Sequence, residues 1–210
     1  MSQETRRAKR AGRVVLQLYR DNASYVADAA AQLGVTCKPG CAHCCMLPAT
    51  ATVPEMVPVV EYLTARSDWK ELRPQLVRDL TRHLTEFAGV DILDRKQREA
   101  FFTRQLPCVF LTKDKRCGIY EVRPTVCRYH MVVSPPENCA HGAAKPTFAR
   151  VDLQSLETTL AVEGAKAFGE LTGGPIALVF VLAAKILGVK LDIDPALIRG
   201  VTRVRVRVPV

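Results

Sequence analysis

The sequence predicts a mainly α-helical fold, in which a helical scaffold carries irregular cysteine-rich metal-binding loops and a small β element. Three observations lead to this prediction. Between Thr52 and Thr103, apolar residues recur at helical spacing in three consecutive segments. Eight cysteines flank these segments in two groups, among residues typical of loops. Residues 107–120 have the pattern of two short extended arms joined by a charged turn, which favours a small hairpin.

Composition sets the limits of the prediction. A chain of 210 residues suits one domain with an extension, and 48% hydrophobic residues are enough for a core. We expect a metal-binding domain over residues 1–145 and a C-terminal helical extension over 146–210, ending in a strand and packed on the first part. Part of the formal net charge of +9 is expected to offset metal-bound thiolates. The rest could face nucleic acid, which has little support, an acidic protein partner or an anionic cofactor.

The sequence predicts a cytoplasmic protein. A basic N-terminal segment is followed by the apolar run Val14–Leu16, which is too short for the hydrophobic region of a secretory signal. The longest apolar run, residues 176–184, is far shorter than the about 20 residues of a membrane span, so we expect a buried helix or strand there and no membrane span. In a reducing compartment the cysteines favour metal binding over disulfides.

The first cysteine group is preceded by a basic tip and a helix. Residues 1–13 are interpreted as a mobile basic segment or a first helical turn, with nucleic-acid contact as the alternative. Residues 14–33 predict one amphipathic helix that ends at Gly34. The stretch Cys37–Cys45 then holds four cysteines, and Pro39 and Gly40 supply a turn. Such a short loop can direct several thiolates to one ion or cluster.

Three helices are expected between the two cysteine groups. Thr52-Val-Pro-Glu55 is a capping box that starts a helix ending near Ala65. A second helix should span 69–87, with leucines at every fourth position, and a third should span 94–103. We interpret these helices as scaffold.

The second cysteine group follows this scaffold. Cys108 and Cys117 lie on the two arms of the predicted hairpin, and Pro124 suits the start of a short helix that carries Cys127. A loop brings in Cys139. Neither group has good geometry to close a four-ligand site alone, so we expect the two groups to meet. The candidate metal ligands are Cys37, Cys41, Cys44, Cys45, Cys108, Cys117, Cys127 and Cys139.

Other polar residues near the cysteines have weaker roles. His43, His130 and His141 are expected to be held by their own hydrogen bonds rather than to bind metal. Arg123 and Arg128 are the candidate cofactor-binding residues. They would either offset thiolate charge or anchor a loop through backbone carbonyls, and anchoring is favoured. Arg128, next to Cys127, is also expected to favour the thiolate of that cysteine.

The C-terminal part is expected to be helical with a terminal strand. A helix should span 152–171, and regular secondary structure should be interrupted from Gly173 to Pro175. Asp194-Pro195 should then cap a short helix that ends at Gly200. Residues 204–208 alternate between valine and arginine, which predicts an edge strand kept soluble by charge. An anion-binding strip formed by Arg203, Arg205 and Arg207 is the alternative.

Both cysteine groups together resemble the CxxxCxxCC cysteine-cluster family, whose members are described as zinc- or iron-chelating. The first motif is matched by Cys37, Cys41, Cys44 and Cys45. A second signature is matched by Cys108, Phe110, Leu111, Cys117, Ile119, Tyr120, Glu121, Arg123, Pro124, Cys127 and Arg128, with Cys139 as the trailing cysteine. The resemblance covers about residues 10–141. The resemblance implies a metal site. Because larger relatives that methylate flagellin lysines are associated with an iron–sulfur cluster, it also implies that the metal could be such a cluster.

The spacing favours a [4Fe–4S] cluster over zinc. Zinc knuckles prefer pairs two residues apart, and here only Cys41 and Cys44 have that spacing. The Cys37–Cys44 spacing also fits radical S-adenosylmethionine enzymes, but the chain lacks the repeating strand–helix units of their barrel. The predicted function is therefore metal binding, with storage, delivery, sensing or redox as the open role. The alternatives are a cluster-dependent protein lysine methyltransferase-like enzyme and a structural zinc module.

Overall fold

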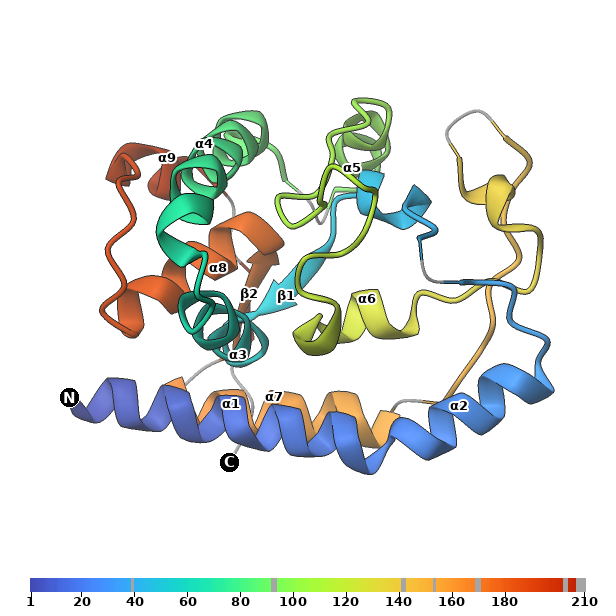
Figure 1. Cartoon of the computed structure of the whole chain (residues 1–210), viewed down its shortest axis with the longest axis horizontal. Coiled ribbons are helices and arrows are strands. Elements are labelled where there is room, and N and C mark those ends of the chain that lie inside the picture. Colours follow the sequence, from blue (N-terminus) through green and yellow to red (C-terminus); the bar gives the residue numbers. More distant parts are fainter. Residues whose placement is uncertain are drawn as a thin grey trace.

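The structure is a computed structural model that describes residues 1–38, 40–91, 94–140, 143–152, 154–168, 171–201 and 204–206. It is mainly helical, as predicted (Figure 1). The helices are α1 (Gln3–Asp21), α2 (Ala23–Gln32), α3 (Val53–Thr64), α4 (Trp69–Phe87), α5 (Arg95–Phe102), α6 (Thr125–Tyr129), α7 (Gln154–Phe168), α8 (Ile176–Ile186) and α9 (Pro195–Gly200). Short 3-10 helices are η1 (His43–Met46), η2 (Tyr120–Val122) and η3 (Pro136–Cys139).

Helix α3 lies at the centre of the fold. The predicted capping box is present: the Glu55 carboxylate accepts hydrogen bonds from the backbone N–H and the hydroxyl of Thr52, both at 2.8 Å. The apolar side chains of α3 are buried, and the helix packs against both α1 and α8. Helix α8 is apolar on all sides and lies in the same core, which decides between the helix and strand predicted for residues 176–184. No helix in the described part of the chain is both long and apolar enough to cross a membrane.

The basic N-terminal segment is helical, not a mobile tip. Helix α1 begins at Gln3, and the Ser2 side chain caps it by accepting a hydrogen bond from the backbone N–H of Thr5 at 3.1 Å. Its charged residues lie around a buried stripe that includes Ala8, Ala11 and Val15. At Gly12 a Cβ atom would lie 2.8 Å from Cγ1 of Val57, so glycine permits the close approach of α1 and α3.

The single helix expected over residues 14–33 is interrupted at Asn22. The Asn22 side chain donates to the carbonyl of Leu18 at 2.8 Å, which caps α1 and separates it from α2. Helix α2 has no buried residue and continues from the end of α1 along the lower edge of the view in Figure 1. Helix α7 lies beside α1 in the same view. It spans Gln154–Phe168 within the predicted range, while Leu153 lies outside the described residues.

The main β element is not the one predicted. Strands β1 (Thr50–Thr52), β2 (Leu171–Pro175) and β3 (Val204–Val206) form an antiparallel sheet in the order β1-β2-β3. The break predicted at Gly173–Pro175 is therefore part of a strand. At Gly173 a Cβ atom would lie 3.2 Å from the carbonyl oxygen of Ala51, so these glycines fit close strand pairing. The hairpin expected at 107–120 is reduced to one antiparallel bridge between Leu111 and Cys117.

The remaining predicted elements are present. Helix α4 has the predicted bounds and buries Leu76, Leu80 and Leu84. Helices α5 and α9 are capped by the side chains of Asp94 and Asp194. Strand β3 lies at the edge of the sheet as predicted, although Arg203 and Arg207 lie outside the described residues. The domain division at residue 145 stays a prediction; α8, from the proposed extension, shares its core with α3.

Candidate metal centre

The first cysteine loop is built on a left-handed turn. Gly40 has a φ of +87°, and the N–H of Cys41 donates to the carbonyl of Lys38 at 3.1 Å. Pro39, the other predicted turn residue, lies outside the described residues. The loop is fixed to the second group at its start, because the N–H of Val132 donates to Sγ of Cys37 at 3.3 Å. Its end enters η1, which carries Cys44 and Cys45.

The two cysteine groups meet, as expected. The backbone N–H of Cys108 donates to the carbonyl oxygen of Cys45 at 2.7 Å. The 3-10 helices η1 and η3 also contact each other, which brings Cys139 to the first loop. Cys108 and Cys117 are connected through the Leu111–Cys117 bridge and a 2.8 Å hydrogen bond from the N–H of Gly118 to the carbonyl of Phe110. The fold thus joins loops that are far apart in sequence.

Apolar side chains shield one side of this region. Val109, Phe110 and Ile119 are buried between or beside the cysteines of the second group. The ring of Phe110 packs edge-on against that of Phe180 in α8, with centroids 5.3 Å apart. The cysteine loops are therefore anchored to the main core of the molecule.

A buried carboxylate positions the helix that carries Cys127. Glu55 of α3 accepts a hydrogen bond from the backbone N–H of Thr125 at 2.8 Å and from the hydroxyl of Tyr19 at 3.0 Å. Thr125 is the first residue of α6, so the Glu55 carboxylate satisfies a helix-terminal N–H that has no partner within the helix. The Tyr19 hydroxyl is also 3.1 Å from that of Thr125, and burial raises the pKa of Tyr19. Hydrogen bonds among these three side chains and the Thr125 backbone therefore connect helices α1, α3 and α6.

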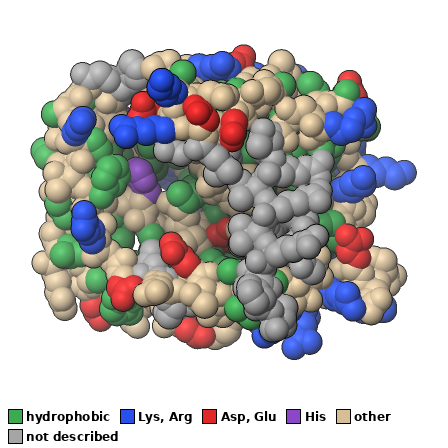
Figure 2. All heavy atoms as spheres, turned by 180° about the vertical axis from the view of Figure 1, so that it is seen from behind, with side chains coloured by type: hydrophobic (Ala, Val, Ile, Leu, Met, Phe, Trp, Pro, Cys, Tyr) green, Lys and Arg blue, Asp and Glu red, His purple; other side chains and the backbone are tan. Residues whose placement is uncertain are grey.

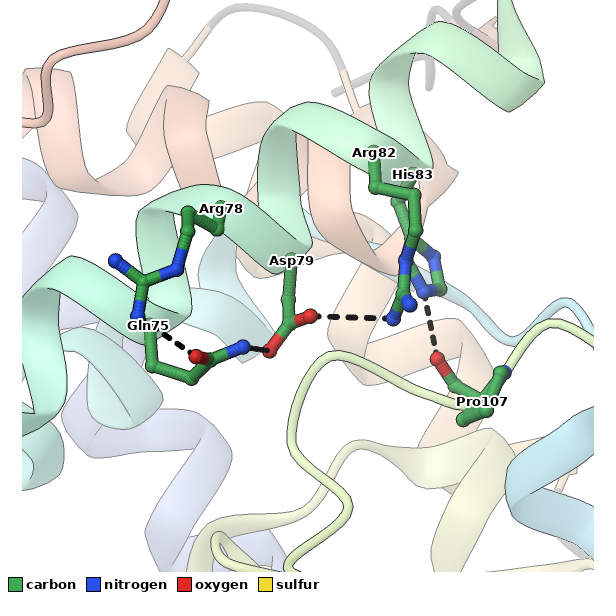
Figure 3. A network of polar contacts seen from close by, with 6 residues as sticks. All are labelled: Gln75, Arg78, Asp79, Arg82, His83 and Pro107. Carbon is green, nitrogen blue, oxygen red and sulfur yellow. Dashed lines mark hydrogen bonds and ion pairs between the residues drawn. The ribbon is translucent and has the colours of Figure 1, made fainter.

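His83 positions the other cysteine segment. Its Nε2 lies 2.7 Å from the carbonyl oxygen of Pro107, the residue before Cys108 (Figure 3). His83 is buried in α4, and burial lowers its pKa, so the neutral ring donates from Nε2. Nearby on α4, Arg82 donates to Asp79 at 3.1 Å on the exposed face (Figure 3). Sequence reasoning missed both His83 and the second role of Glu55. The only available signal was a polar residue among the apolar positions of each helix.

The adjacent thiols of Cys44 and Cys45 have different acidities. A hydrogen bond from Cys45 is the largest cause that lowers the pKa of Cys44, to about 7. The same hydrogen bond, followed by burial, raises the pKa of Cys45. At neutral pH, Cys44 therefore has substantial thiolate character while Cys45 keeps its proton. The thiolate is the form that binds metal, so the pair divides into a ligand-ready thiol and a donor beside it.

The second-group thiols are held in a desolvated setting. Burial raises the pKa of Cys108 to about 12, and it also raises the pKa values of Cys117 and Cys127. Repulsion from the other thiols adds to these shifts, which shows that Cys44, Cys108, Cys117 and Cys127 lie within electrostatic range of one another. The pKa of Cys139 is raised by burial and then by Cys37, Cys41 and Cys44. A bound cation would offset all of this repulsion.

Arg123 and Arg128 have separate roles. Arg128 anchors the loop as expected: its Nε donates to the carbonyl of Arg123 at 2.8 Å, its Nη2 donates to that of Glu121, and its guanidinium lies over the ring of Tyr19 at 4.2 Å. The expectation that it favours the Cys127 thiolate stays a prediction. Arg123 lowers the pKa of Cys127, but burial raises it and outweighs this effect.

Arg123 is the residue that faces the thiols. Its charge lowers the pKa values of Cys44 and Cys117 as well as Cys127. Its guanidinium lies over the Tyr120 ring at 3.8 Å, and its buried Nε has no hydrogen-bond partner among the described residues. A buried N–H without a partner is costly, so an acceptor at this position is expected. A metal-bound sulfur would supply such an acceptor.

The thiols gather without closing a ligand shell. In the described part of the chain, no group of three or more His, Cys, Asp or Glu side chains has the geometry to hold a metal ion. Of the histidines, His130 packs edge-on against Phe148 at 5.0 Å, and burial lowers its pKa. His141 lies outside the described residues. The donor chemistry suits a soft metal, and the side chains of the loops would have to turn toward it.

The described Lys and Arg side chains are not concentrated on the face shown in Figure 2. Lys and Arg side chains lie mainly around its rim, with acidic and apolar groups between them. Exposed cations elsewhere form ion pairs, such as Lys9 with Glu61 at 3.1 Å and Arg66 with Asp68 at 2.6 Å. Among the side chains that the structure describes, this face therefore shows no continuous basic strip for a nucleic acid backbone.

Comparison with known proteins agrees with the cysteine geometry. The chain matches the family model CxxCxxCC, a putative zinc- or iron-chelating domain, over residues 36–149, which is more than half of the 210 residues. The match includes every cysteine of the chain. In this sequence three residues, rather than two, separate Cys37 from Cys41. No curated protein and no solved structure matches the chain.

Proposed function

The chain belongs to the CxxCxxCC family of zinc- or iron-chelating domains, and from this premise we propose that its two cysteine groups together hold a [4Fe–4S] cluster. The observation that carries the proposal is the 2.7 Å hydrogen bond from the N–H of Cys108 to the carbonyl of Cys45, which joins the groups at their backbones. A cluster of this type takes four cysteine thiolates. Neither group offers four well-placed thiols by itself.

The surroundings favour a cluster over zinc. Structural zinc sites use closely spaced pairs on rigid turns, whereas Cys108, Cys117 and Cys127 are widely and irregularly spaced. Buried apolar side chains, such as those of Phe110 and Ile119, limit the access of water, which helps to set the potential of an iron–sulfur centre. Zinc is the alternative, and the spacing of Cys41 and Cys44 supports it.

We assign the inner ligand set to Cys44, Cys108, Cys117 and Cys127. These four thiols act on one another electrostatically, and Arg123 acts on three of them. In this assignment Cys45 orients Cys44 by hydrogen bonding, and Arg123 donates its unpartnered Nε to sulfur and offsets negative charge. When bound, the cluster supplies one-electron redox chemistry.

The outer cysteines would form a second, more exposed set. Cys37 is exposed, and Cys37 and Cys41 both raise the pKa of Cys139. We propose that this set serves storage, delivery, sensing or redox exchange at the protein surface, with a protein partner and in a reducing, cytoplasmic compartment. The backbone N–H of Val132 at Sγ of Cys37 is the kind of hydrogen bond that stabilises a metal-bound thiolate.

An anaerobic preparation of the full chain tests the proposal. Iron and inorganic sulfide in equal amounts, with a broad visible absorption that bleaches on reduction, would support the cluster. One or two zinc ions per chain, without visible absorption, would support the alternative and overturn the proposal. Cys139→Ser provides a comparison for Cys127→Ser, because the first removes an outer thiol and the second an inner one.

A further inference from the structure

A pocket lies on the first half of α4, separate from the cysteine loops. It has a volume of about 470 Å³, within the range of small-molecule sites. Figure 1 shows α4 and α9 on one side of the sheet and α6 on the other. The pocket combines an aromatic and apolar wall with several cations, and neither part is used by the proposed metal centre.

The apolar wall is formed by Trp69, Pro74 and Val77. Trp69 is half-buried and packs against the main core, so its indole is held in place while part of it borders the pocket. A fixed indole surface next to a proline and a valine is a stacking site for a flat ring. This wall selects a ligand with an aromatic part.

The polar wall is strongly positive. Lys70, Arg73 and Arg78 line it, and Asp192 is its only acidic residue in the described chain. Asp192 is already paired with Nη2 of Arg73 at 2.7 Å, which fixes the Arg73 side chain beside the pocket. The Nε of Arg73 is buried and has no hydrogen-bond partner among the described residues. Three cations and one paired carboxylate leave this wall with excess positive charge, which suits an anionic ligand.

We propose that this pocket binds a nucleotide-type ligand, an organic anion that joins a flat aromatic ring to a phosphate or diphosphate group. The ring would stack on Trp69. The phosphate oxygens would accept hydrogen bonds from Arg73 and bind the exposed charges of Lys70 and Arg78. Figure 3 shows Arg78 next to Gln75, whose side-chain oxygen it contacts at 2.7 Å; a phosphate would compete for this exposed contact.

Fluorescence gives a direct test, because Trp69 is the only tryptophan of the chain. The metal-loaded full chain is titrated with ADP, adenosine and pyrophosphate, and its metal content is measured before and after. We expect ADP to change the Trp69 emission and to bind at least about tenfold more tightly than either adenosine or pyrophosphate, since each lacks one half of the recognised chemistry. No change in emission at millimolar ADP would overturn the proposal. Equal affinity for ADP and adenosine, or for ADP and pyrophosphate, would overturn it as well.

A double variant separates the pocket from general charge effects. Lys70→Gln with Arg78→Gln is expected to weaken ADP binding about tenfold or more, because two charged contacts are lost while the fold is untouched at these exposed positions. Arg82→Gln removes one positive charge from the same helix outside the pocket and is expected to leave the affinity unchanged. If Arg82→Gln weakens binding as much as the double variant, ADP follows the net charge of the helix and the proposal is wrong.

Discussion

The carboxylate of Glu55 lies 2.8 Å from the backbone nitrogen of Thr125, a residue 70 positions further along the chain. This hydrogen bond links the central helix α3 to the first turn of α6, which carries Cys127. The same carboxylate accepts hydrogen bonds from Thr52 and Tyr19. A buried carboxylate is tolerated when donors surround it, and here each donor belongs to a different part of the fold. Glu55 therefore connects the position of a metal-binding thiol to the stability of the scaffold.

Replacing Glu55 should lower both the stability of the fold and the amount of metal that the chain binds. In Glu55→Gln the side-chain NH₂ group would face backbone N–H donors that need an acceptor. Leaving such groups unsatisfied in a buried position costs about 1–3 kcal/mol each. We expect a loss of about 2–4 kcal/mol in the free energy of unfolding, measured in urea, together with reduced metal content because α6 is released.

Glu61→Gln is the matched control. Glu61 lies on the same helix and pairs with Lys9 at the surface, where an ion pair contributes at most about 1 kcal/mol. The Glu61→Gln variant should unfold at nearly the same urea concentration as the wild type and should retain its metal. If Glu55→Gln behaves like Glu61→Gln, then Glu55 does not position α6.

The acidity of Cys44 should depend on Cys45. Because the hydrogen bond from Cys45 is the main cause that lowers the pKa of Cys44 to about 7, removal of that thiol should raise the pKa. In metal-free Cys45→Ala, the rate of Cys44 alkylation at pH 7 is expected to fall at least about tenfold, since less thiolate is present. The measurement is alkylation against pH, with the modified residue identified by mass spectrometry.

Cys37→Ala is the comparison for this experiment, because it removes a thiol of the same loop that is not bonded to Cys44. It should leave the pH dependence of Cys44 alkylation in place. A Cys44 profile that is the same in Cys45→Ala and in the wild type would show that the two thiols are independent.

The parts of the fold that could be predicted are those with strong local signals. The Thr52–Glu55 capping box, the leucine periodicity of α4 and the Asp194 cap all depend on neighbours in sequence, and all are present. The sheet could not be predicted, because β1 is three residues long and β2 contains Gly173 and Gly174, which have low strand propensity. Tertiary pairing with Ala51 overrides that propensity.

The candidate metal centre likewise has features that the sequence predicts and features that only the folded chain reveals. The cysteines and their two groups could be identified from spacing, and their meeting could be inferred from ligand counting. The second role of Glu55 and the contact between His83 and Pro107 could not, because each depends on a partner that only the folded chain brings near. The sequence leaves a mobile segment and a helical turn both open for residues 1–13, because the many charges there hide the buried alanine stripe that packs α1 beside α3.

His83 should make stability depend on pH. Burial lowers its pKa in the folded chain below the ordinary value of 6.5. The unfolded chain therefore binds the proton more readily, and the stability from the neutral ring is present above pH 6.5 and is lost as the pH falls below that value. In the wild type, the free energy of unfolding should decrease between pH 7 and 5 more than it does in His83→Gln.

Glutamine at this position can still donate to the Pro107 carbonyl but does not titrate. The difference in pH dependence between the wild type and His83→Gln therefore reports the protonation of the His83 ring. Parallel slopes for the wild type and His83→Gln would show that the His83 proton is not linked to folding.

The last prediction ranks the thiols by how much metal each one holds. Serine at Cys44 or Cys127 should remove most of the bound metal, because both belong to the proposed inner ligand set and oxygen is a poor replacement for sulfur at a soft metal. Serine at Cys37 or Cys41 should remove the metal that the outer set holds. Cys44 acts on both thiol sets, and Cys127 is positioned through α6. Serine at Cys45 or Cys139 should remove less, since Cys45 keeps its proton and acts on its neighbour. Iron, zinc and sulfide per chain, measured in each variant after anaerobic preparation, provide the test. Full metal retention in Cys41→Ser would take the first loop out of the site, and equal losses in Cys45→Ser and Cys44→Ser would show that the adjacent thiols exchange roles.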